Sequence, residues 1–206
     1  DTYVNYHEPH LGKYAVWVLE ALGFRVVAAN AGCCCRPAIS KGFLEDAKRD
    51  GTKTLKNLDV FAKQGLPIVG IEPSCVSSLK GDLADLVDDE EMATRVAEHV
   101  HPIEDFIESE IKAGRAKLDL PKAAKKYLLH GHCHQKTLFS TDPLKHLMGS
   151  DNGSDRIEEV DSGCCGMAGS FGYEQEHYEI SQKVGEDRLY PAVRKTPEDQ
   201  TIIANG

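Results

Sequence analysis

The feature that most constrains the fold is a repeated order of apolar strand-like runs and helical stretches. In the first half, short apolar or β-branched runs near residues 2–6, 24–29 and 66–71 are separated by helical patterns. The same order returns from about residue 125, and the equivalent residues Cys33 and Cys164 lie 131 positions apart. Because apolar strands that alternate with helices are typical of parallel sheets, we expect an α/β fold of two pseudo-symmetric β-α-β-α-β halves.

The boundaries of the halves follow from the same pattern. The second half has its strand-like runs in KYLLHGHC, RIEEVDSGCC and QTIIANG. Between the halves, helical patterns are separated by Pro102, a residue that is tolerated in a first helical turn but disrupts a helix interior. We predict a first half at 1–79, a helical insertion at 80–122 and a second half at 123–206. The last run leads into Asn-Gly, which is typical of a turn, so we expect a part of a longer protein.

The charge and hydropathy pattern argues against some partners. The 206 residues include 24 Lys and Arg against 33 Asp and Glu, a formal net charge of −9. We therefore expect neither nucleic acid nor an anionic membrane surface as the main partner. No apolar run approaches the roughly 20 residues of a membrane-spanning helix, and the first residues do not resemble a secretion signal. We predict a soluble domain.

The cysteines are grouped directly after the predicted strands. The seven are Cys33, Cys34, Cys35, Cys75, Cys133, Cys164 and Cys165. Neighbouring cysteines rarely bond to each other, so this arrangement argues against a secreted disulfide scaffold and for a reducing cytoplasm. The carboxyl ends of parallel strands meet at one edge of a sheet, and thiolates are soft ligands for zinc and iron–sulfur clusters. A metal or cluster site at this edge is therefore predicted.

The segment HGHCHQK places Cys133 between His132 and His134. On an extended strand, residues 132 and 134 point away from the side of residue 133, so the three cannot easily converge. We predict that Cys133 shares a site with Cys164 and Cys165 rather than forming a local chelate. The two histidines are expected to hydrogen-bond near that site or assist proton transfer, or else to be ordinary structural histidines.

Basic residues beside the cysteine turns are further candidates. Arg36, Lys41 and Lys136 either offset the negative charge of a thiolate centre or are simply solvated. The segment NYHEPH, residues 5–10, contains a bare His-x-x-His, which is a weak metal signal. An ordinary helix start is the favoured interpretation there.

Five segments in order carry a resemblance to a known family: GCCCRPAISKG, GIEPSC, HGHCHQKTL, DSGCCGMAGSFG and TIIANG. Together they resemble the cysteine-rich CCG domain of heterodisulfide reductase and of the iron–sulfur subunits of glycolate oxidase and anaerobic glycerol-3-phosphate dehydrogenase. Through RPAISKG and CCGMAGSFGYEQEHY the chain is most similar to the C-terminal region of FAD-linked D-lactate dehydrogenase-like oxidases. The resemblance extends over nearly all of the chain except residues 80–122.

The resemblance implies iron–sulfur binding, of the 4Fe-4S type in the intact protein. Its ligands would be Cys33, Cys34 and Cys75 in the first half and Cys133, Cys164 and Cys165 in the second. Asn5 stands where the fullest family pattern has a cysteine, and Cys35 stands where it has a glycine. A last cysteine is expected beyond Gly206, so a cluster in this piece is expected to be absent or replaced by zinc.

Two functions are compatible with these features. The first is an electron-transfer domain of a flavin-dependent 2-hydroxyacid oxidoreductase of the lactate or glycolate type, which accepts electrons from a flavin domain or subunit. Its electron acceptor would be a quinone, a cytochrome or a thiol, and it would lie in the cytoplasm or peripherally at the inner face of the membrane. FAD and the substrate-oxidising site would lie outside this chain, because no G-x-G-x-x-G follows a strand, and no catalytic residue is assigned. The second is a zinc- or thiol-bearing docking scaffold without a redox role.

Overall fold

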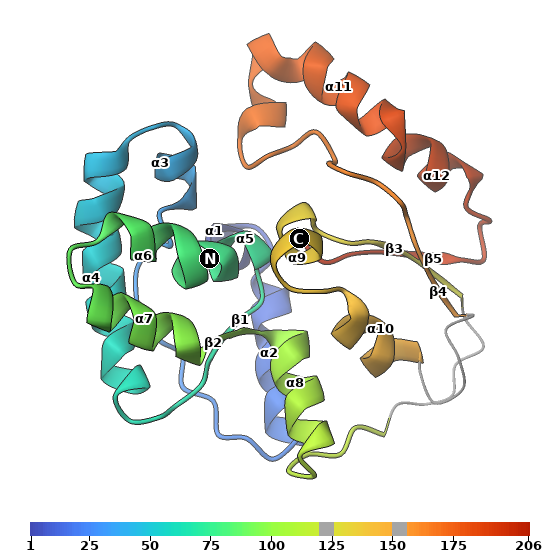
Figure 1. Cartoon of the computed structure of the whole chain (residues 1–206). Helices are drawn as coiled ribbons and strands as arrows, with labels where there is room; N and C mark the ends of the chain where they lie inside the picture. Colours follow the sequence, from blue (N-terminus) through green and yellow to red (C-terminus); the bar gives the residue numbers. More distant parts are fainter. Residues whose placement is uncertain (120–125, 150–155) are drawn as a thin grey trace. The chain divides into compact units, whose positions relative to one another are not determined.

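The chain consists of two compact units that each combine helices with a short parallel sheet. The computed structural model describes residues 1–119, 126–149 and 156–206. The units are Asp1–Asp119 and Leu120–Gly206 (Figure 1). The sheets of both units contain only parallel pairs among the described strands. The α/β class expected from the sequence is therefore confirmed.

The first unit is mainly helical. Its helices are α1 (Thr2–Tyr6), α2 (Pro9–Ala21), α3 (Arg36–Ser40), α4 (Leu44–Ala62), α5 (Pro73–Ser77), the π-helical turn η1 (Ser78–Asp82), α6 (Leu83–Leu86), α7 (Glu90–His99) and α8 (Ile103–Lys112). The strands β1 (Ile68–Gly70) and β2 (Val100–Pro102) pair in parallel, with Ile68 opposite Val100. Pro102 is the N-cap of α8, so the predicted helix boundary at this proline is confirmed.

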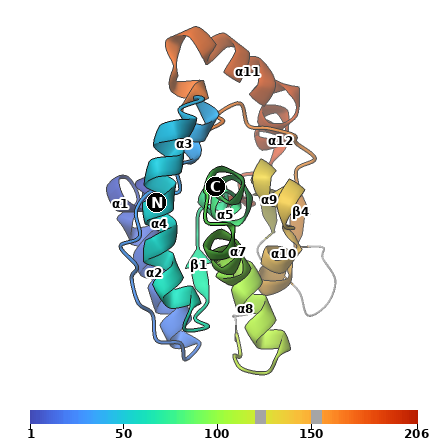
Figure 2. The same cartoon turned by 60° about the vertical axis from the view of Figure 1, so that its left-hand side comes forward.

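The core of the first unit lies between α4, α6 and α7. Leu55, Leu83 and Val96, one from each helix, have no exposed surface. Figures 1 and 2 show α7 lying beside α4 in both views. The two helices are joined by an ion pair from Arg95 Nε to the buried carboxylate of Asp59, at 2.7 Å. Burial of these apolar side chains supplies the main force that holds the helices together.

Two predicted strands of the first half are wrong. Residues 2–6 form α1, because the Asp1 side chain accepts the Val4 N–H at 2.9 Å and caps a helical turn. Residues 24–29 form neither helix nor strand, and Val27 is 58% exposed. Strand β1 pairs instead with β2, which lies inside the stretch at 80–122 that was predicted to be wholly helical. That prediction is also wrong for residues 100–102.

The second unit forms the three predicted strands. Its elements are β3 (Tyr127–His130), α9 (Cys133–Leu138), α10 (Asp142–Gly149), β4 (Ile157–Glu159), the 3-10 turns η2 (Phe171–Tyr173) and η3 (Gln175–His177), α11 (Tyr178–Asp187), α12 (Leu189–Lys195) and β5 (Thr201–Ala204). The sheet order is β4-β3-β5. Leu129, at the centre, is fully buried and lies opposite Glu159 and Ile203. The residues after β3 and β4 are thereby brought to one edge of this sheet.

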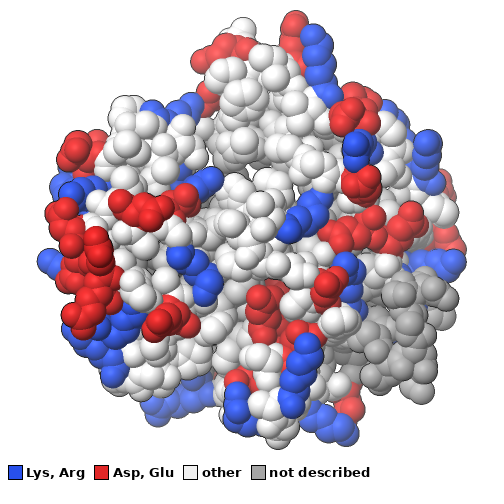
Figure 3. Space-filling view, in the orientation of Figure 1, with Lys and Arg blue, Asp and Glu red and all other residues white. Residues whose placement is uncertain are grey.

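Charged side chains of both signs are interspersed on the face shown in Figure 3. Many pair with a neighbour on the same helix, as Arg49 does with Asp46 at 2.6 Å in α4. Exposed pairs of this kind contribute little to stability. Across the ranges that the structure describes, no helix combines the length and the apolar character that crossing a membrane requires.

Candidate thiol sites

The triple-cysteine turn of the first unit is held by hydrogen bonds from two helices. Thr54 of α4 donates its hydroxyl to the carbonyl of Cys33 at 2.8 Å, and Ser78 of η1 donates to the carbonyl of Cys34 at 2.7 Å. Cys35 has a left-handed backbone with φ 61°, which is uncommon for a residue with a side chain. This conformation directs its N–H to the Cys33 sulfur at 3.3 Å. The backbone of the turn therefore donates a hydrogen bond to one of the turn's own sulfur atoms.

Cys34 and Cys75 form a thiol pair. Cys75 lies in α5, whose first turn is capped by the Glu72 carboxylate accepting the Ser74 N–H at 3.0 Å. The two sulfurs lie 3.1 Å apart. The hydrogen bond with Cys75 lowers the pKa of Cys34 to about 7, against the opposing effect of burial. The same contact, followed by burial, raises the pKa of Cys75. The contact thus favours a thiolate at Cys34 beside a protonated Cys75.

Cys35 behaves differently from its neighbours. It is buried, and its sulfur donates to the carbonyl of Cys33 at 3.5 Å. Burial, followed by the charge of Cys33, raises the pKa of Cys35 to about 11. Cys33 is exposed. Cys35 is therefore a neutral structural thiol in this geometry.

The Arg36 side chain faces an acidic residue. Its guanidinium pairs with the Asp82 carboxylate at 2.5 Å. The backbone N–H of Arg36 contributes to lowering the pKa of Cys34. The main chain of Arg36 therefore supports this thiol.

In the second unit, Cys133 is the first residue of a helix. His132 is the N-cap of α9, and its Nδ1 accepts the N–H of His134 at 3.2 Å. The expectation of an extended strand through residues 132–134 is wrong, because β3 ends at His130. Burial is the largest cause that raises the pKa of Cys133, and the charge of Cys164 adds to it. The cysteine turn at residues 164–165 therefore affects the pKa of Cys133 electrostatically.

The turn Cys164-Cys165-Gly166 repeats the geometry of the first turn. Gly166 has φ +89°, and its N–H donates to the Cys164 sulfur at 3.4 Å. In each turn the third residue has a positive φ and gives its N–H to the sulfur of the first cysteine. The register of 131 residues inferred from the sequence thus matches the local backbone geometry.

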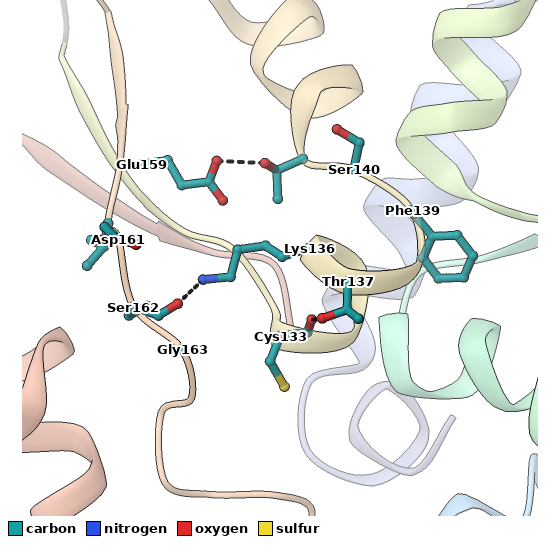
Figure 4. Close-up of a pocket in the computed structure, with 11 residues that line it drawn as sticks. Cys133, Lys136, Thr137, Phe139, Ser140, Glu159, Asp161, Ser162 and Gly163 are labelled. Carbon is teal, nitrogen blue, oxygen red and sulfur yellow. Dashed lines mark hydrogen bonds between the residues drawn. The ribbon is translucent and has the colours of Figure 1, made fainter.

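Lys136 lies in a cavity of about 590 Å³ (Figure 4). Its ammonium donates to the carbonyl of Ser162, and the Cys133 side chain lies at the same cavity. Glu159 accepts the Thr141 hydroxyl at 2.7 Å. The cavity lies after β3 and β4, where ligands of parallel sheets usually bind. It is lined by Cys133, Lys136, Thr137, Phe139, Ser140, Thr141, Glu159, Val160, Asp161, Ser162 and Gly163.

Thiolates are suitable ligands for a soft metal ion or an iron–sulfur cluster, but the side chains do not form a complete ligand set. Within the described residues, no three His, Cys, Asp or Glu side chains are placed so that they could hold a metal ion. The first unit nevertheless has two sulfurs in contact, and both cysteine turns direct a backbone N–H at a sulfur. Thiolates with such donors are typical of iron–sulfur sites. The two predicted ligand sets remain predictions.

The structure adds residues that the sequence patterns did not single out. Thr54 and Ser78 hold the first turn, and Asn205, after β5, accepts the His132 N–H at 2.8 Å. Of these three residues, only Asn205 had a sequence signal for a role at the site, because it is a polar residue directly after an apolar strand. Residues 7–10 form the favoured helix start, with Pro9 as the first residue of α2.

The family comparison identifies part of the first unit. The family model of the cysteine-rich domain CCG matches residues 2–80. Residues 2–80 form a CCG cysteine-rich domain. This domain contains the Cys34 and Cys75 pair and the triple-cysteine turn, so the resemblance inferred from the sequence motifs is confirmed.

Curated relatives of the chain include a dehydrogenase subunit, a dehydrogenase and a lactate utilization protein. A subunit of the anaerobic glycerol-3-phosphate dehydrogenase of Escherichia coli is 26% identical over 89% of this chain and 46% of its own length. D-2-hydroxyglutarate dehydrogenase of Pantoea ananatis is 25% identical over 100% of this chain and 19% of its own length. Lactate utilization protein A of Oceanobacillus iheyensis is 31% identical over 78% of this chain and 66% of its own length. The chain thus spans about half of the first relative and about a fifth of the second.

Proposed function

We propose that this chain is the iron–sulfur electron-transfer domain of a flavin-dependent 2-hydroxyacid oxidoreductase. The observation that carries the proposal is the Cys34 and Cys75 pair, with sulfurs 3.1 Å apart, inside the residues that match the CCG domain. The names of two relatives, a D-2-hydroxyglutarate dehydrogenase and a lactate utilization protein, support this substrate class. Lactate and glycolate are the substrates that we favour.

In this proposal each unit contributes one set of thiolate ligands. The sets are Cys33, Cys34 and Cys75, and Cys133, Cys164 and Cys165. An iron–sulfur cluster, of the 4Fe-4S type, supplies one-electron redox chemistry when it is bound. The protein residues bind and orient it: Cys34 is poised as a thiolate near neutral pH, and the N–H groups of Cys35 and Gly166 are donors to ligand sulfurs. Lys136 offsets negative charge beside Cys133, with His132 and His134 in its surroundings.

The partners in this proposal lie outside the chain. A flavin domain or subunit with bound FAD oxidises the 2-hydroxy acid, and the electrons continue to a quinone, a cytochrome or a thiol. The domain works in the cytoplasm, at the inner face of the membrane where the acceptor is a quinone. The larger relatives, in which sequence equivalent to this chain is a fraction of the whole, support the proposal that the partners lie outside this chain.

Anaerobic reconstitution tests the proposal. We expect a longer protein that includes this chain and the expected last cysteine, reconstituted with ferrous iron and sulfide without oxygen, to gain a broad visible absorption, acid-labile sulfide and an EPR signal on reduction. Cys34→Ser is expected to lose a large part of the bound iron. Cys35→Gly is the matched control, because it removes a neighbouring thiol and places glycine at a positive φ.

Two results would count against an electron-transfer role. One is a longer protein, with the expected last cysteine, that binds neither iron nor sulfide after reconstitution. The other is a longer protein that binds zinc stoichiometrically and keeps it in the presence of iron, which favours the docking scaffold. Equal iron content in Cys34→Ser and Cys35→Gly would remove Cys34 from the ligand set.

A further inference from the structure

The side chain of Asn205 links the end of β5 to the segment that carries Cys133. Its Oδ1 accepts the backbone N–H of His132 at 2.8 Å, and its Nδ2 donates to Oε1 of Gln135. Gln135 has no exposed surface, and its Nε2 donates to the carbonyl of Ser140 at 3.1 Å. One asparagine amide therefore connects the last strand to both ends of the first turn of α9.

These contacts surround Cys133 on both sides along the chain. Asn205 binds the residue before Cys133 through the backbone and the residue two positions after it through the side chain. A helix turn held at both points can neither rotate nor fray without breaking a hydrogen bond. Since Gln135 is fully buried, loss of Asn205 would leave a buried acceptor without this donor, which is costly.

We propose that Asn205 is a positioning residue for Cys133, holding the first turn of α9 so that the sulfur keeps its place. Within this turn the N–H of His134 donates to His132 Nδ1 at 3.2 Å. Movement of the first turn would therefore move the Cys133 sulfur with it. The position and surroundings of a ligand sulfur tune the potential of a bound cluster, so the effect on potential, but not the positioning, rests on the proposed function.

The first experiment measures positioning without a cluster. In the reduced, cluster-free full chain, the rate at which iodoacetamide modifies each cysteine is followed by peptide mass spectrometry. We expect Asn205→Ala to raise the rate at Cys133 at least about fivefold, because the first turn opens more often when the two hydrogen bonds of Asn205 are lost and one typical hydrogen bond already corresponds to about this factor. The rates at Cys164 and Cys165 are expected to stay within about twofold. Asn57→Ala is the matched control, because Asn57 also donates to a backbone carbonyl, that of Ala31 at 3.0 Å, but lies in the first unit.

Two conservative variants separate positioning from general destabilisation. Asn205→Asp keeps an oxygen that accepts the His132 N–H but loses the donor to Gln135 Oε1, so it is expected to restore part of the protection of Cys133. Gln135→Met keeps the side-chain size, removes the acceptor of Asn205, and is expected to reproduce part of the increase. If Asn205→Ala does not fold, these two variants give the same comparison.

The outcomes that overturn the proposal are specific. An unchanged rate at Cys133 in Asn205→Ala, or an equal increase at all cysteines of the second unit, would show that Asn205 does not position Cys133. In the reconstituted longer protein, Asn205→Ala is expected to shift the reduction potential while Asn57→Ala leaves it unchanged. A longer protein that takes up no cluster in any variant contradicts the proposed function, whereas the alkylation result still decides the role of Asn205.

Discussion

Gly166→Ala should destabilise the second unit far more than an ordinary glycine substitution. Gly166 has φ +89°, a conformation that costs a residue with a side chain roughly 1–2 kcal/mol. An added Cβ would also overlap the backbone carbonyl oxygen of Ser181, a fully buried residue, and would lie 3.1 Å from its Oγ. Because a backbone atom cannot rotate away, this overlap adds about 1–3 kcal/mol. We expect a total loss of about 2–5 kcal/mol.

Gly169→Ala is the matched control. Gly169 lies in the same loop with φ +68°, but a Cβ there would meet nothing within 4 Å. It should therefore show the backbone cost alone, about 1–2 kcal/mol. The free energy of opening, measured by amide hydrogen exchange in β3, reports on the second unit directly.

The difference between the two variants is the decisive quantity. If Gly166→Ala and Gly169→Ala destabilise β3 equally, the close approach of Ser181 contributes nothing and the reasoning is wrong. If the reasoning is right, Gly166→Ala should also change the modification rate of Cys164, because the Gly166 N–H would no longer be directed at its sulfur.

Three further predictions concern the first unit. Ser78→Ala removes the buried hydroxyl that donates to the Cys34 carbonyl at 2.7 Å. It should lower the free energy of unfolding, measured by urea titration, by about 1–2 kcal/mol. Thr52→Ala is the control and should be near neutral, because the Thr52 hydroxyl bonds within its own helix. A similar loss of stability in both variants would contradict this prediction. Burial raises the pKa of Asp105 to about 6, above the usual value of about 3.9 in an unfolded chain, so the stability associated with its protonated form is present below pH ~4 and lost as pH rises through about 6. Asp105→Asn should therefore stabilise the unit by about 1 kcal/mol at pH 8, after allowance for solvent screening, and have little effect at pH 4; equal effects at both pH values would refute the assignment. Cys75→Ala should raise the pKa of Cys34 from about 7 toward that of an ordinary thiol. In cluster-free protein this change would appear as a higher midpoint in the pH dependence of Cys34 alkylation. An unchanged midpoint would show that Cys75 does not stabilise the thiolate.

The strands of the second unit could be predicted from sequence because each has a neighbour in the predicted pattern. β3 lies between β4 and β5, and its apolar Leu128 and Leu129 are both buried. In the first unit the same kind of pattern failed at residues 2–6 and 24–29. A local run specifies an extended backbone only if a second strand satisfies its hydrogen bonds, and the strand beside β1 came from residues 100–102.

The cysteine turns could be predicted as equivalent, but not the means by which they are held. The positive φ that both turns share could not be predicted at Cys35, because a cysteine stands there where the second turn has Gly166. Thr54, Ser78 and Asn205 act from segments 21 to 73 residues away in the chain, and no local pattern reports such pairings. Cys75, Cys133 and Cys164 follow strands as predicted, whereas the triple-cysteine turn follows none. Long-range hydrogen bonds help to determine how the two cysteine segments are held.

The π-helical turn η1 gives the helix that begins at Pro73 and ends at Leu86 one residue more than regular α geometry would need. A π turn accommodates an extra residue as a local bulge in an α-helix. Deleting a single residue from 79–81 would restore regular α geometry and leave the residues beyond it on the same side relative to Cys75, whereas a deletion from a wholly α-helical segment rotates the residues beyond it by about 100°. Asp82 would then still face Arg36, and Leu83 would stay in the core. The helix beneath the first thiol site can thus lose one residue at this turn, but not within α5, without losing those two contacts.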